Sequence, residues 1–589
     1  MSLFHSTLLR RRRLIGVLAA AALVTAPMLA TTTNASAATA PGGGSEIRPY
    51  EPGEDAVAPD VKAPKSNAPS HVPARDVPKV NGLPVTGTTG VSRRIAGLTM
   101  QDQRTSNGGN SFSIEPPDQG LCVGNGRVIE AVNNVFAIYQ SGVMQGSPQS
   151  FDPFWNNGTA EIDRTNAPNY VYGPFVSDPK CYYDPGTGRF FMTELQLGTD
   201  PTTGDFTGDS FENVAVSKTS TPTTSAADWY LYRLNVRNDG TQGTPDHTGC
   251  PCQGDQPLIG ADRYGFYVST NESPLFQSGF NGAQLYAFDK VALTNGVMRV
   301  QRLESNGLPL AEGVAYSVQP ATSPTATQWS GAANGTEYFL SALEFTGGFD
   351  NRIATWALTN TKSLATQNPA VHLSYDVVGS EVYGLPPQAL QKIGPTPLAD
   401  AVHAKEEMIA SNDDRMNQVV YAHGKLWSGL NTAVKTPVGP ATAGIAYFVV
   451  SPSVSHNQVA GTMSHQGYVA VNGNSTIFPA IGVNPNGSAV MTFSLTGKGY
   501  YPSAAIVHLG PNGGLTSGVQ RLAAGVVPDD GFSGYPAYGG AGVGRWGDYS
   551  AAVSDGAGKV WVATEYIPGT FGYPPYLANW GTYVASVTP

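Results

Sequence analysis

Acidic side chains recur in this sequence at a fixed distance before a glycine, and they are the groups with the clearest chemical potential. Asp178 precedes Gly188 by ten residues, and the same interval separates the next members of the series from their glycines. The series consists of Asp118 (with a shortened interval), Asp178, Asp255, Asp414 and Asp548. Carboxylates gathered in one place can serve as acid and base in glycoside cleavage, because crowding keeps one protonated while another stays ionised.

A second polar position follows the turn glycine by seven residues in several units, and by six at Glu194. Its members are Glu194, Glu272, Asn431, Ser494 and Glu565. If each unit is a hairpin, both sets meet at one end of the sheets. The predicted catalytic residues are therefore Asp178, Asp255 and Asp548 with Glu194, Glu272 and Glu565, and the predicted ligand-binding residues are Asp118, Asp414, Arg545 and Trp546.

Two other interpretations of these acids stay open. A ring of carboxylates could hold a calcium ion, a hard cation that prefers oxygen ligands. A repeated aspartate before a strand could also serve the fold alone, by accepting hydrogen bonds from backbone N–H groups at a turn. The sequence predicts no cofactor, with a calcium ion as the alternative.

The repeated unit itself reads as a β-hairpin. Residues 545–566 alternate apolar and polar around a Gly- and Asp-containing turn, which favours a hairpin. Weaker copies around Gly335 and Gly487 bring the number of hairpins to seven, and each is followed by further alternating runs. Four strands in each of seven units predict an all-β fold, a seven-bladed β-propeller. Residues 91–114 are expected to complete the last blade, because the chain stops at Pro589 before a fourth strand.

The first ninety residues predict export and a tether. Four arginines, an apolar run and Ala35-Ser36-Ala37 indicate a signal peptide over residues 1–37. Residues 38–90 are rich in Pro, Gly and Ala and are expected to form a disordered linker, followed by one propeller domain over 91–589. A net charge of −10 argues against nucleic acid as a partner. No later apolar run has membrane length, so we expect a secreted monomer without a membrane span.

Four cysteines in an exported chain favour disulfides. Cys122–Cys181 with Cys250–Cys252 is the favoured pairing among three connectivities. His247 with Cys250 and Cys252 could alternatively be part of a zinc site, but zinc prefers four ligands and the sequence indicates no fourth.

The chain resembles a known family in three stretches: EPPDQGLCVGNGRVIEAVNN, SDPKCYYDPGTGRFFMT and RWGDYSAAVSDGAGKVWVATEY. They look like the repeats of secreted bacterial β-propeller proteins, similar in arrangement to sialidase-type propellers with BNR repeats. The resemblance implies the architecture only. Ser554-Asp555-Gly556-Ala557-Gly558 lacks the spacing of a sialidase Asp box, and no arginine triad matches.

The sequence therefore predicts an extracellular propeller that binds or cleaves a polysaccharide or glycan at the mouth of its central channel. The alternative is a non-catalytic extracellular binding module. An enzyme should have closely spaced carboxyl groups, at least one with a raised pKa. A binding module should have its aspartates engaged by backbone hydrogen bonds.

Overall fold

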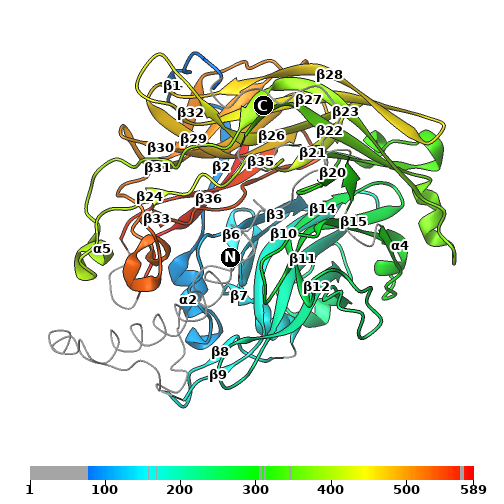
Figure 1. Cartoon of the computed structure of the whole chain (residues 1–589), viewed down its shortest axis with the longest axis horizontal. Helices are drawn as coiled ribbons and strands as arrows, with labels where there is room; N and C mark the ends of the chain where they lie inside the picture. Colours follow the sequence, from blue (N-terminus) through cyan, green and yellow to red (C-terminus); the bar gives the residue numbers. More distant parts are fainter. Residues whose placement is uncertain are drawn as a thin grey trace.

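The computed structural model describes residues 77–156, 158–167, 169–303, 308–310, 313–343, 348–570 and 576–589. The predicted signal peptide and residues 38–76 of the predicted linker lie outside these ranges. Within them the chain is all-β, with mostly antiparallel sheets and a few short helices (Figure 1). None of the described helices combines the length and the apolar character needed to cross a membrane.

The first three large sheets follow the chain in order. Sheet 1 contains β3 (Gln119–Gly124), β4 (Arg127–Val132), β5 (Val135–Gln140), β6 (Val143–Met144) and β7 (Gln149–Ser150). Sheet 2 contains β10 (Phe175–Asp184), β11 (Arg189–Thr199), β12 (Phe206–Ser217) and β13 (Trp229–Asn235). Sheet 3 contains β14 (Cys252–Ala261), β15 (Gly265–Pro274), β16 (Gly282–Asp289) and β17 (Val300–Leu303).

Sheets 4 and 5 are joined into one eight-stranded sheet by parallel pairing of β20 with β25. Sheet 4 contains β20 (Gln319–Thr322), β21 (Thr336–Ala342), β22 (Phe349–Thr359) and β23 (His372–Gly384). Sheet 5 contains β25 (Val419–Ala422), β26 (Lys425–Val434), β27 (Thr442–Ser455) and β28 (Gln458–Val469).

Sheets 6 and 7 each include a strand from the N-terminal part of the described chain. Sheet 6 contains β29 (Asn474–Val483), β30 (Ala489–Gly497), β31 (Tyr500–Leu509) and β32 (Val519–Ala523), with β1 (Val85–Thr86) parallel to β32. Sheet 7 contains β34 (Ala551–Ser554), β35 (Val560–Tyr566) and β36 (Gly581–Val587), with β2 (Val91–Thr99) antiparallel to β36. The last residues of the predicted linker therefore run along the folded body.

Short elements connect the sheets. The small strand pairs are β8 (Ile162–Asp163) with β9 (Val171–Tyr172), β18 (Pro309–Leu310) with β19 (Gly313–Val314), and β24 (Met408–Ile409) with β33 (Val543–Gly544). The helices are α2 (Met100–Gly109), α3 (Phe151–Trp155), α4 (Lys290–Leu293) and α5 (Pro397–Ala401). Single 3₁₀ turns are η2 (Ala226–Asp228), η3 (Ala326–Gln328), η4 (Ala332–Asn334), η5 (Thr361–Ala365), η6 (Phe532–Gly534) and η7 (Pro536–Tyr538).

The predicted turn glycines lie where hairpins need them. Asn125 and Gly126 between β3 and β4 have φ angles of 47° and 76°, and His423 and Gly424 between β25 and β26 have φ angles of 51° and 71°. Two consecutive positive φ values define the tight turn whose twist matches that of the flanking strands. Glycine adopts such angles without steric conflict, which explains why it recurs at this point of the unit.

The hydrophobic core is divided among the gaps between consecutive sheets. The cluster that contains Phe136 and Met192 joins sheet 1 to sheet 2, and similar clusters join each later sheet to its successor. Another cluster, with Leu121 and Val584, joins sheet 7 back to sheet 1. The first strands contact one another in the order β3, β10, β14, β20, β25, β29 and β34, and β34 contacts β3. Because sheets pack on both of their faces, strands such as β26 and β30 are buried along all or nearly all of their length.

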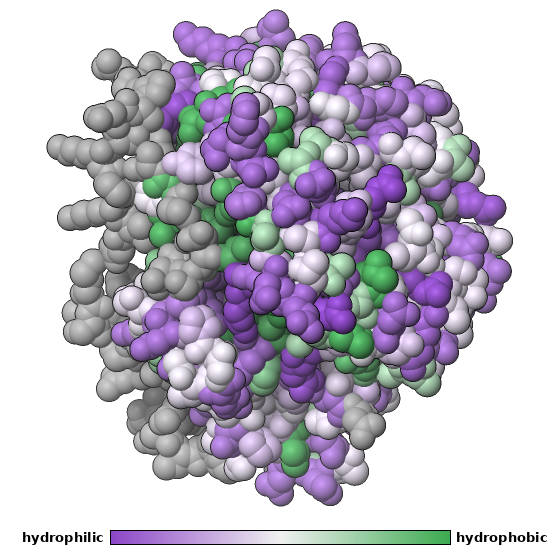
Figure 2. Space-filling view, turned by 90° about the vertical axis from the view of Figure 1, so that its right-hand side faces the viewer, coloured by the Kyte–Doolittle hydropathy of each residue, from purple (hydrophilic) through white to green (hydrophobic). Residues whose placement is uncertain are grey.

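The surface seen in Figure 2 is mostly hydrophilic, as expected when apolar side chains are buried between sheets. On the face shown in Figure 2, hydrophilic residues cover most of the described area and hydrophobic ones form small groups. Burial of apolar area is the dominant favourable term in folding, and here most of it is gained where one sheet packs on the next.

The segment expected to complete the last sheet is only partly a strand. Residues 91–99 pair with β36, but the chain then turns into α2 rather than continuing as a strand to residue 114. Thr99 accepts a hydrogen bond from the Asp102 N–H, and the Asp102 carboxylate accepts one from the Thr99 N–H. This reciprocal capping satisfies two N–H groups that a helix otherwise leaves unbonded, so Thr-x-x-Asp starts a helix there.

Both predicted disulfides are present. Cys122 of β3 is bonded to Cys181 of β10 across 59 residues, and Cys250 is bonded to Cys252. The first bond ties the first strands of sheets 1 and 2 together.

Glu130 of β4 connects sheet 1 to both outer strands of sheet 7. Its carboxylate accepts hydrogen bonds from the Leu98 N–H of β2 at 3.2 Å and the Tyr139 hydroxyl at 2.9 Å. It also accepts one from the Thr582 hydroxyl of β36. Burial raises the pKa of Glu130 to about 7, although these hydrogen bonds oppose the shift.

The Glu130→Gln variant should remove a pH dependence of stability. Because the pKa is higher in the folded chain than in the unfolded chain, the protonated carboxyl contributes fully below about pH 4.5, and this contribution is lost as the pH rises to about 7. Between these pH values the free energy of unfolding of the wild type should fall by about 3 kcal/mol more than that of Glu130→Gln. Urea unfolding at several pH values measures this difference, and parallel profiles would contradict the assignment.

Candidate functional site

Four of the five predicted aspartates come together where the first strands begin. Asp118 directly precedes β3, Asp548 lies three residues before β34, and Asp178 and Asp255 lie within β10 and β14. These strands are neighbours in space. All four side chains are buried, and Asp548 is the most exposed at 7 %. We call Asp118, Asp178, Asp255 and Asp548 the axial aspartates.

The backbone is irregular beside two of the axial aspartates. Asp178 has a φ of 60°, and Gln256, next to Asp255, has a φ of 51°. The pairing register of β10 and of β14 shifts at these residues, and each is followed by a proline. Such conformations cost about 1–3 kcal/mol for a residue other than glycine, and bulges change the direction in which side chains point. Each bulge therefore interrupts the regular alternation of its strand at the acidic residue.

Hydrogen bonds link the axial aspartates to one another. The Asp548 N–H donates to Asp118 Oδ1 at 2.8 Å, and Asn133 Nδ2 donates to Asp118 Oδ2 at 3.2 Å. The Ser177 hydroxyl donates to Asp178 Oδ1 at 2.9 Å. Arg545 Nη2 lies 2.7 Å from Asp548 Oδ2, and Asn412 Nδ2 donates to Asp548 Oδ1 at 3.1 Å.

Crowding favours the protonated form of three of these acids. Burial raises the pKa of Asp118 well above its usual value, and the charges of Asp548 and Asp178 raise it further. Burial likewise raises the pKa of Asp178, with Asp548 as the next cause, and that of Asp255, with Asp178 as the next cause. The Arg545 charge opposes all three shifts. The cluster thus combines three carboxyl groups of raised pKa with a carboxylate that is paired with arginine.

Two further cations lie among the axial aspartates, and neither was predicted from the sequence. Arg415 binds the Asp413 carboxylate at 2.8 Å and donates to Gln256 Oε1 at 2.7 Å. Burial alone would lower the pKa of Arg415, but the charges of Asp413, Asp548 and Asp255 raise it. Lys180 Nζ lies over the Tyr549 ring, and burial lowers its pKa well below the usual value. Lys180 follows the Asp178-Pro179 bulge, and Arg415 follows Asp414. A basic residue shortly after a repeated aspartate is therefore the sequence signal that could have identified both.

Glu565 lies beside the axial aspartates, as predicted. Its Oε2 accepts a hydrogen bond from the Gly547 N–H at 2.8 Å. Burial raises its pKa well above the usual value, and the charges of Asp529, Glu115 and Asp118 add to the shift.

A second group of buried acids adjoins Glu565 and was missed from the sequence. It consists of Glu115, Glu407, Asp529 and Asp530, all at most 6 % exposed. Burial raises the pKa of Asp529 to about 7 and raises the pKa of Glu115 and of Glu407 well above the usual value. A Cβ at Gly531, Gly534 or Gly544 would overlap a carboxylate of this group, so the glycines of residues 531–544 permit the close approach. Three segments far apart in the chain supply these acids, and no repeat relates them.

Glu194 does not join the axial aspartates, so its predicted position is wrong. It lies on the side of sheet 2 that faces α3, where Trp155 Nε1 donates to its carboxylate. Burial raises its pKa well above the usual value, with Asp152 and Glu161 among the further causes. The side-chain alternation of β11 explains the error, because a strand directs successive residues to opposite sheet faces.

Glu272 is also wrongly placed by the prediction. It lies beside the Cys250–Cys252 disulfide, where its Oε1 is 2.7 Å from His247 Nδ1 and 2.9 Å from Asn281 Nδ2. Asn238 donates to its other oxygen. His247 and Asn238 come from the segment between β13 and β14, and Asn281 comes from the segment between β15 and β16, so Glu272 is bound away from the axial aspartates.

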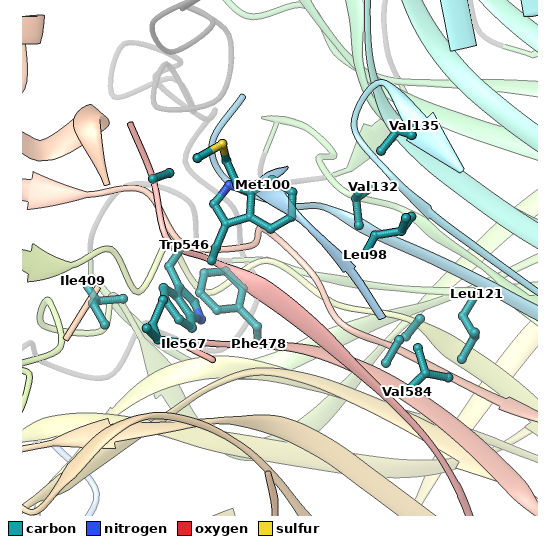
Figure 3. Packing of buried hydrophobic residues seen from close by; sticks show 14 of the residues in the cluster. Leu98, Met100, Leu121, Val132, Val135, Ile409, Phe478, Trp546, Ile567 and Val584 are labelled. Atoms are coloured by element: carbon teal, nitrogen blue, oxygen red, sulfur yellow. The ribbon is translucent and has the colours of Figure 1, made fainter. Parts of the chain in front are cut away.

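Asp414 and Trp546 are both engaged within the fold. Asp414 is 2 % exposed and accepts a hydrogen bond from the Tyr316 hydroxyl at 3.3 Å. Trp546 is 1 % exposed, donates to the Ser494 hydroxyl at 3.0 Å, and packs among Ile409, Phe478 and Ile567 (Figure 3). The indole is therefore part of the core, whereas the sequence predicted a ligand-binding role for Trp546.

The other end of the first strands carries a pocket of about 60 Å³. Residues of β3, β10, β20, β25, β29 and β34, or of the turns after them, line it, among them Val123, Tyr183, Val420 and Val483. The lining is largely apolar, in contrast to the acidic and basic groups at the opposite strand ends.

Metal ligation at the axial aspartates has no geometric support. Among the residues that the structure describes, Cys250, Cys252 and Glu272 are the one group of three whose possible ligand atoms lie within 4.8 Å of one another. The axial aspartates are not such a group, and we assign no calcium site to them.

Comparisons with known proteins give no family for the chain. No protein-family model matches it, and no curated protein matches it. Solved structures with likeness to it include a protein of unknown function from Dyadobacter fermentans, at 11% identity and a TM-score of 0.34, covering 70% of this chain and 94% of that one. A sialidase from Trypanosoma rangeli is 10% identical with a TM-score of 0.33, covering 73% of this chain and 55% of that one.

An endo-arabinase from Bacteroides thetaiotaomicron is 10% identical with a TM-score of 0.25, covering 70% of this chain and 94% of that one. Likenesses at such TM-scores establish neither a shared function nor a shared site. Any functional conclusion depends on the chain's own residues.

The ion pair between Arg545 and Asp548 can be tested by a double-mutant cycle. Arg545→Met should lower the free energy of unfolding by about 3 kcal/mol, because Asp548 is then left charged, buried and beside other acids. Adding Asp548→Asn should restore most of this loss. Urea unfolding of the single and double variants measures the coupling, and strictly additive effects would contradict the pairing.

Proposed function

We propose that the chain forms a seven-bladed β-propeller in which β2 completes the last blade. Support comes from the cyclic order of contacts among first strands and from the apolar clusters between consecutive sheets, including the one between sheets 7 and 1. Pairing of β36 with β2 removes an exposed sheet edge, which is the usual reason for such closure.

We further propose that the protein is exported, with residues 1–37 as signal peptide and residues 38–76 as tether to a propeller domain. The two disulfides are compatible with an oxidising extracellular environment.

We propose that the protein binds or cleaves an extracellular glycan at the end of the central channel where the axial aspartates lie. The single observation that carries this proposal is that one cluster combines a carboxyl group of raised pKa with an ion-paired carboxylate. Burial and acidic neighbours raise the pKa of Asp118 well above its usual value, while Asp548 is paired with Arg545. Glycoside cleavage uses one protonated and one ionised carboxyl group, so Asp118 is the proposed acid and Asp548 the proposed ionised partner.

A second candidate function is that of a non-catalytic glycan-binding module. It is favoured by the engagement of the axial aspartates within the fold, such as the bond from the Asp548 N–H to Asp118. In that case the acids order the strand entries, and the ligand contacts the loops around them.

Sugar release from a panel of extracellular polysaccharides tests the proposal, together with binding measured by affinity electrophoresis. Sugar release by Asp118→Asn and by Asp548→Asn should be at least about 100-fold lower than release by the wild type. Each change removes one of the two carboxyl groups that the reaction requires. Glu194→Gln is the matched control, since this buried acid lies away from the axis.

Binding without sugar release would reject the enzyme and leave the binding module. If the protein neither binds nor cleaves any polysaccharide of the panel, both candidate functions are rejected. Circular dichroism of each variant verifies that lost activity does not reflect unfolding.

A further inference from the structure

The Cys250–Cys252 disulfide lies against a buried carboxylate. Pro251 alone separates the two cysteines, and Cys252 begins β14. Glu272 on the neighbouring strand β15 is 1 % exposed, and its Oε1 lies 3.8 Å from Cys250 Sγ. The two sulfurs and a Glu272 oxygen all lie within 4.8 Å of one another. Two sulfurs and one oxygen at such distances can ligate a single metal ion once the S–S bond is opened.

The partners of Glu272 hold its carboxylate toward the sulfurs. Asn281 Nδ2 lies 2.9 Å from Glu272 Oε1, 3.7 Å from Cys250 Sγ and 3.5 Å from Cys252 Sγ. His247 Nδ1 lies 2.7 Å from the same Glu272 oxygen, and His247 is 4 % exposed. Its Nε2 is buried without a hydrogen-bond partner among the described residues. Hydrogen bonds that orient a ligating carboxylate are the usual support of a metal site.

The two disulfides differ in how easily a reductant can open them. Cys250 is partly exposed, whereas Cys122 and Cys181 are 1 % and 7 % exposed. The cysteines of the Cys122–Cys181 bond are 59 positions apart in the sequence, whereas those of the Cys250–Cys252 bond are 2 positions apart. A bond that closes a short loop constrains the unfolded chain far less, so its loss affects the fold far less. Reduction can therefore open Cys250–Cys252 while the other bond stays intact.

We propose that a dithiol reductant converts this disulfide into a zinc site formed by Cys250, Cys252 and Glu272. In the first step, the S–S bond takes two electrons and two protons from the dithiol, which is oxidised to its own disulfide. In the second step, both thiols lose their protons as the thiolates bind Zn²⁺. Water takes the fourth position, and His247 and Asn281 orient the Glu272 carboxylate. Oxidation of the two thiolates by a disulfide compound reverses the sequence and releases the ion.

Zinc is the ion that this ligand set favours. Thiolates are soft ligands that select Zn²⁺ or Cu⁺ over Ca²⁺ and Mg²⁺. Three protein ligands with a position left for water are typical of open zinc sites. From the sequence alone, no fourth zinc ligand was evident beside His247, Cys250 and Cys252. Glu272 lies on the neighbouring strand β15, and only the pairing of β14 with β15 brings it to the two cysteines. This site is separate from the axial aspartates and does not rest on the proposed glycan function.

Metal titration of the exported chain, before and after dithiol treatment, tests the proposal. Mass spectrometry after alkylation identifies preparations in which Cys250 and Cys252 are reduced while Cys122–Cys181 is intact. The reduced protein should bind one Zn²⁺ per chain. With Co²⁺ as a probe it should show thiolate-to-metal charge-transfer absorption, and the untreated protein should show neither signal.

Variants identify the ligands. Cys250→Ser/Cys252→Ser should lose the charge-transfer band, and Glu272→Gln should weaken Zn²⁺ binding at least about 10-fold in the reduced protein. Glu194→Gln, another buried acid that accepts a hydrogen bond, should bind as the wild type does. Wild type alkylated at Cys250 and Cys252 replaces the double variant if that variant does not fold.

Three results would overturn the proposal. The first is that the reduced wild type binds Zn²⁺ no better than the protein blocked at both cysteines. The second is that Glu272→Gln leaves the Zn²⁺ affinity of the reduced protein unchanged. The third is that the wild type binds Zn²⁺ equally well before and after reduction.

Discussion

Pairing between β2 and β36 joins Val91 to Val587, residues near the two ends of the described chain. Without β2, the backbone groups of β36 would form an open edge, and sheet 7 would lose its outermost strand. Leu98 of β2 lies in the same apolar cluster as Leu121 of sheet 1, and its N–H bonds to Glu130. One strand thus completes a sheet and contributes to the gap between the last sheet and the first.

This arrangement determines the electrostatics at the strand entries. The first strands start close together, so residues that directly precede or begin them are removed from water together. A carboxylate removed from water either becomes protonated or acquires a cation. Both effects are found at residues in direct contact: the pKa of Asp118 is raised, whereas Asp548 is paired with Arg545. The acids of this region are therefore consequences of the fold as well as candidates for chemistry.

Much of the architecture could be predicted from local patterns. Turn glycines such as Gly126 and Gly424 have the positive φ angles that their spacing implied, and the cysteine pairing favoured from the sequence is the one present. Side-chain direction was harder, because the period of a strand is two and an error of one residue changes the sheet face. For this reason the Glu194 side chain lies on the sheet face opposite to the predicted one. The bulge at Asp178 recurs at Gln256 in β14, but the spacing of the repeat did not predict it. The capping pair that turns residues 100–109 into a helix lies outside the repeat.

Contacts between loops that lie outside the repeat could not be predicted, since no local pattern reports them. Glu407 and Asp529 meet across loops that the repeat does not relate. The central claim remains that β2 is an integral strand of sheet 7, and hydrogen exchange of the full chain tests it most directly. The amides of residues 91–99 that pair with β36 should exchange as slowly as those of β35 at Val560–Tyr566, with a similar opening free energy. Exchange of residues 91–99 at the rate of an unstructured peptide, with β35 still protected, would contradict the account.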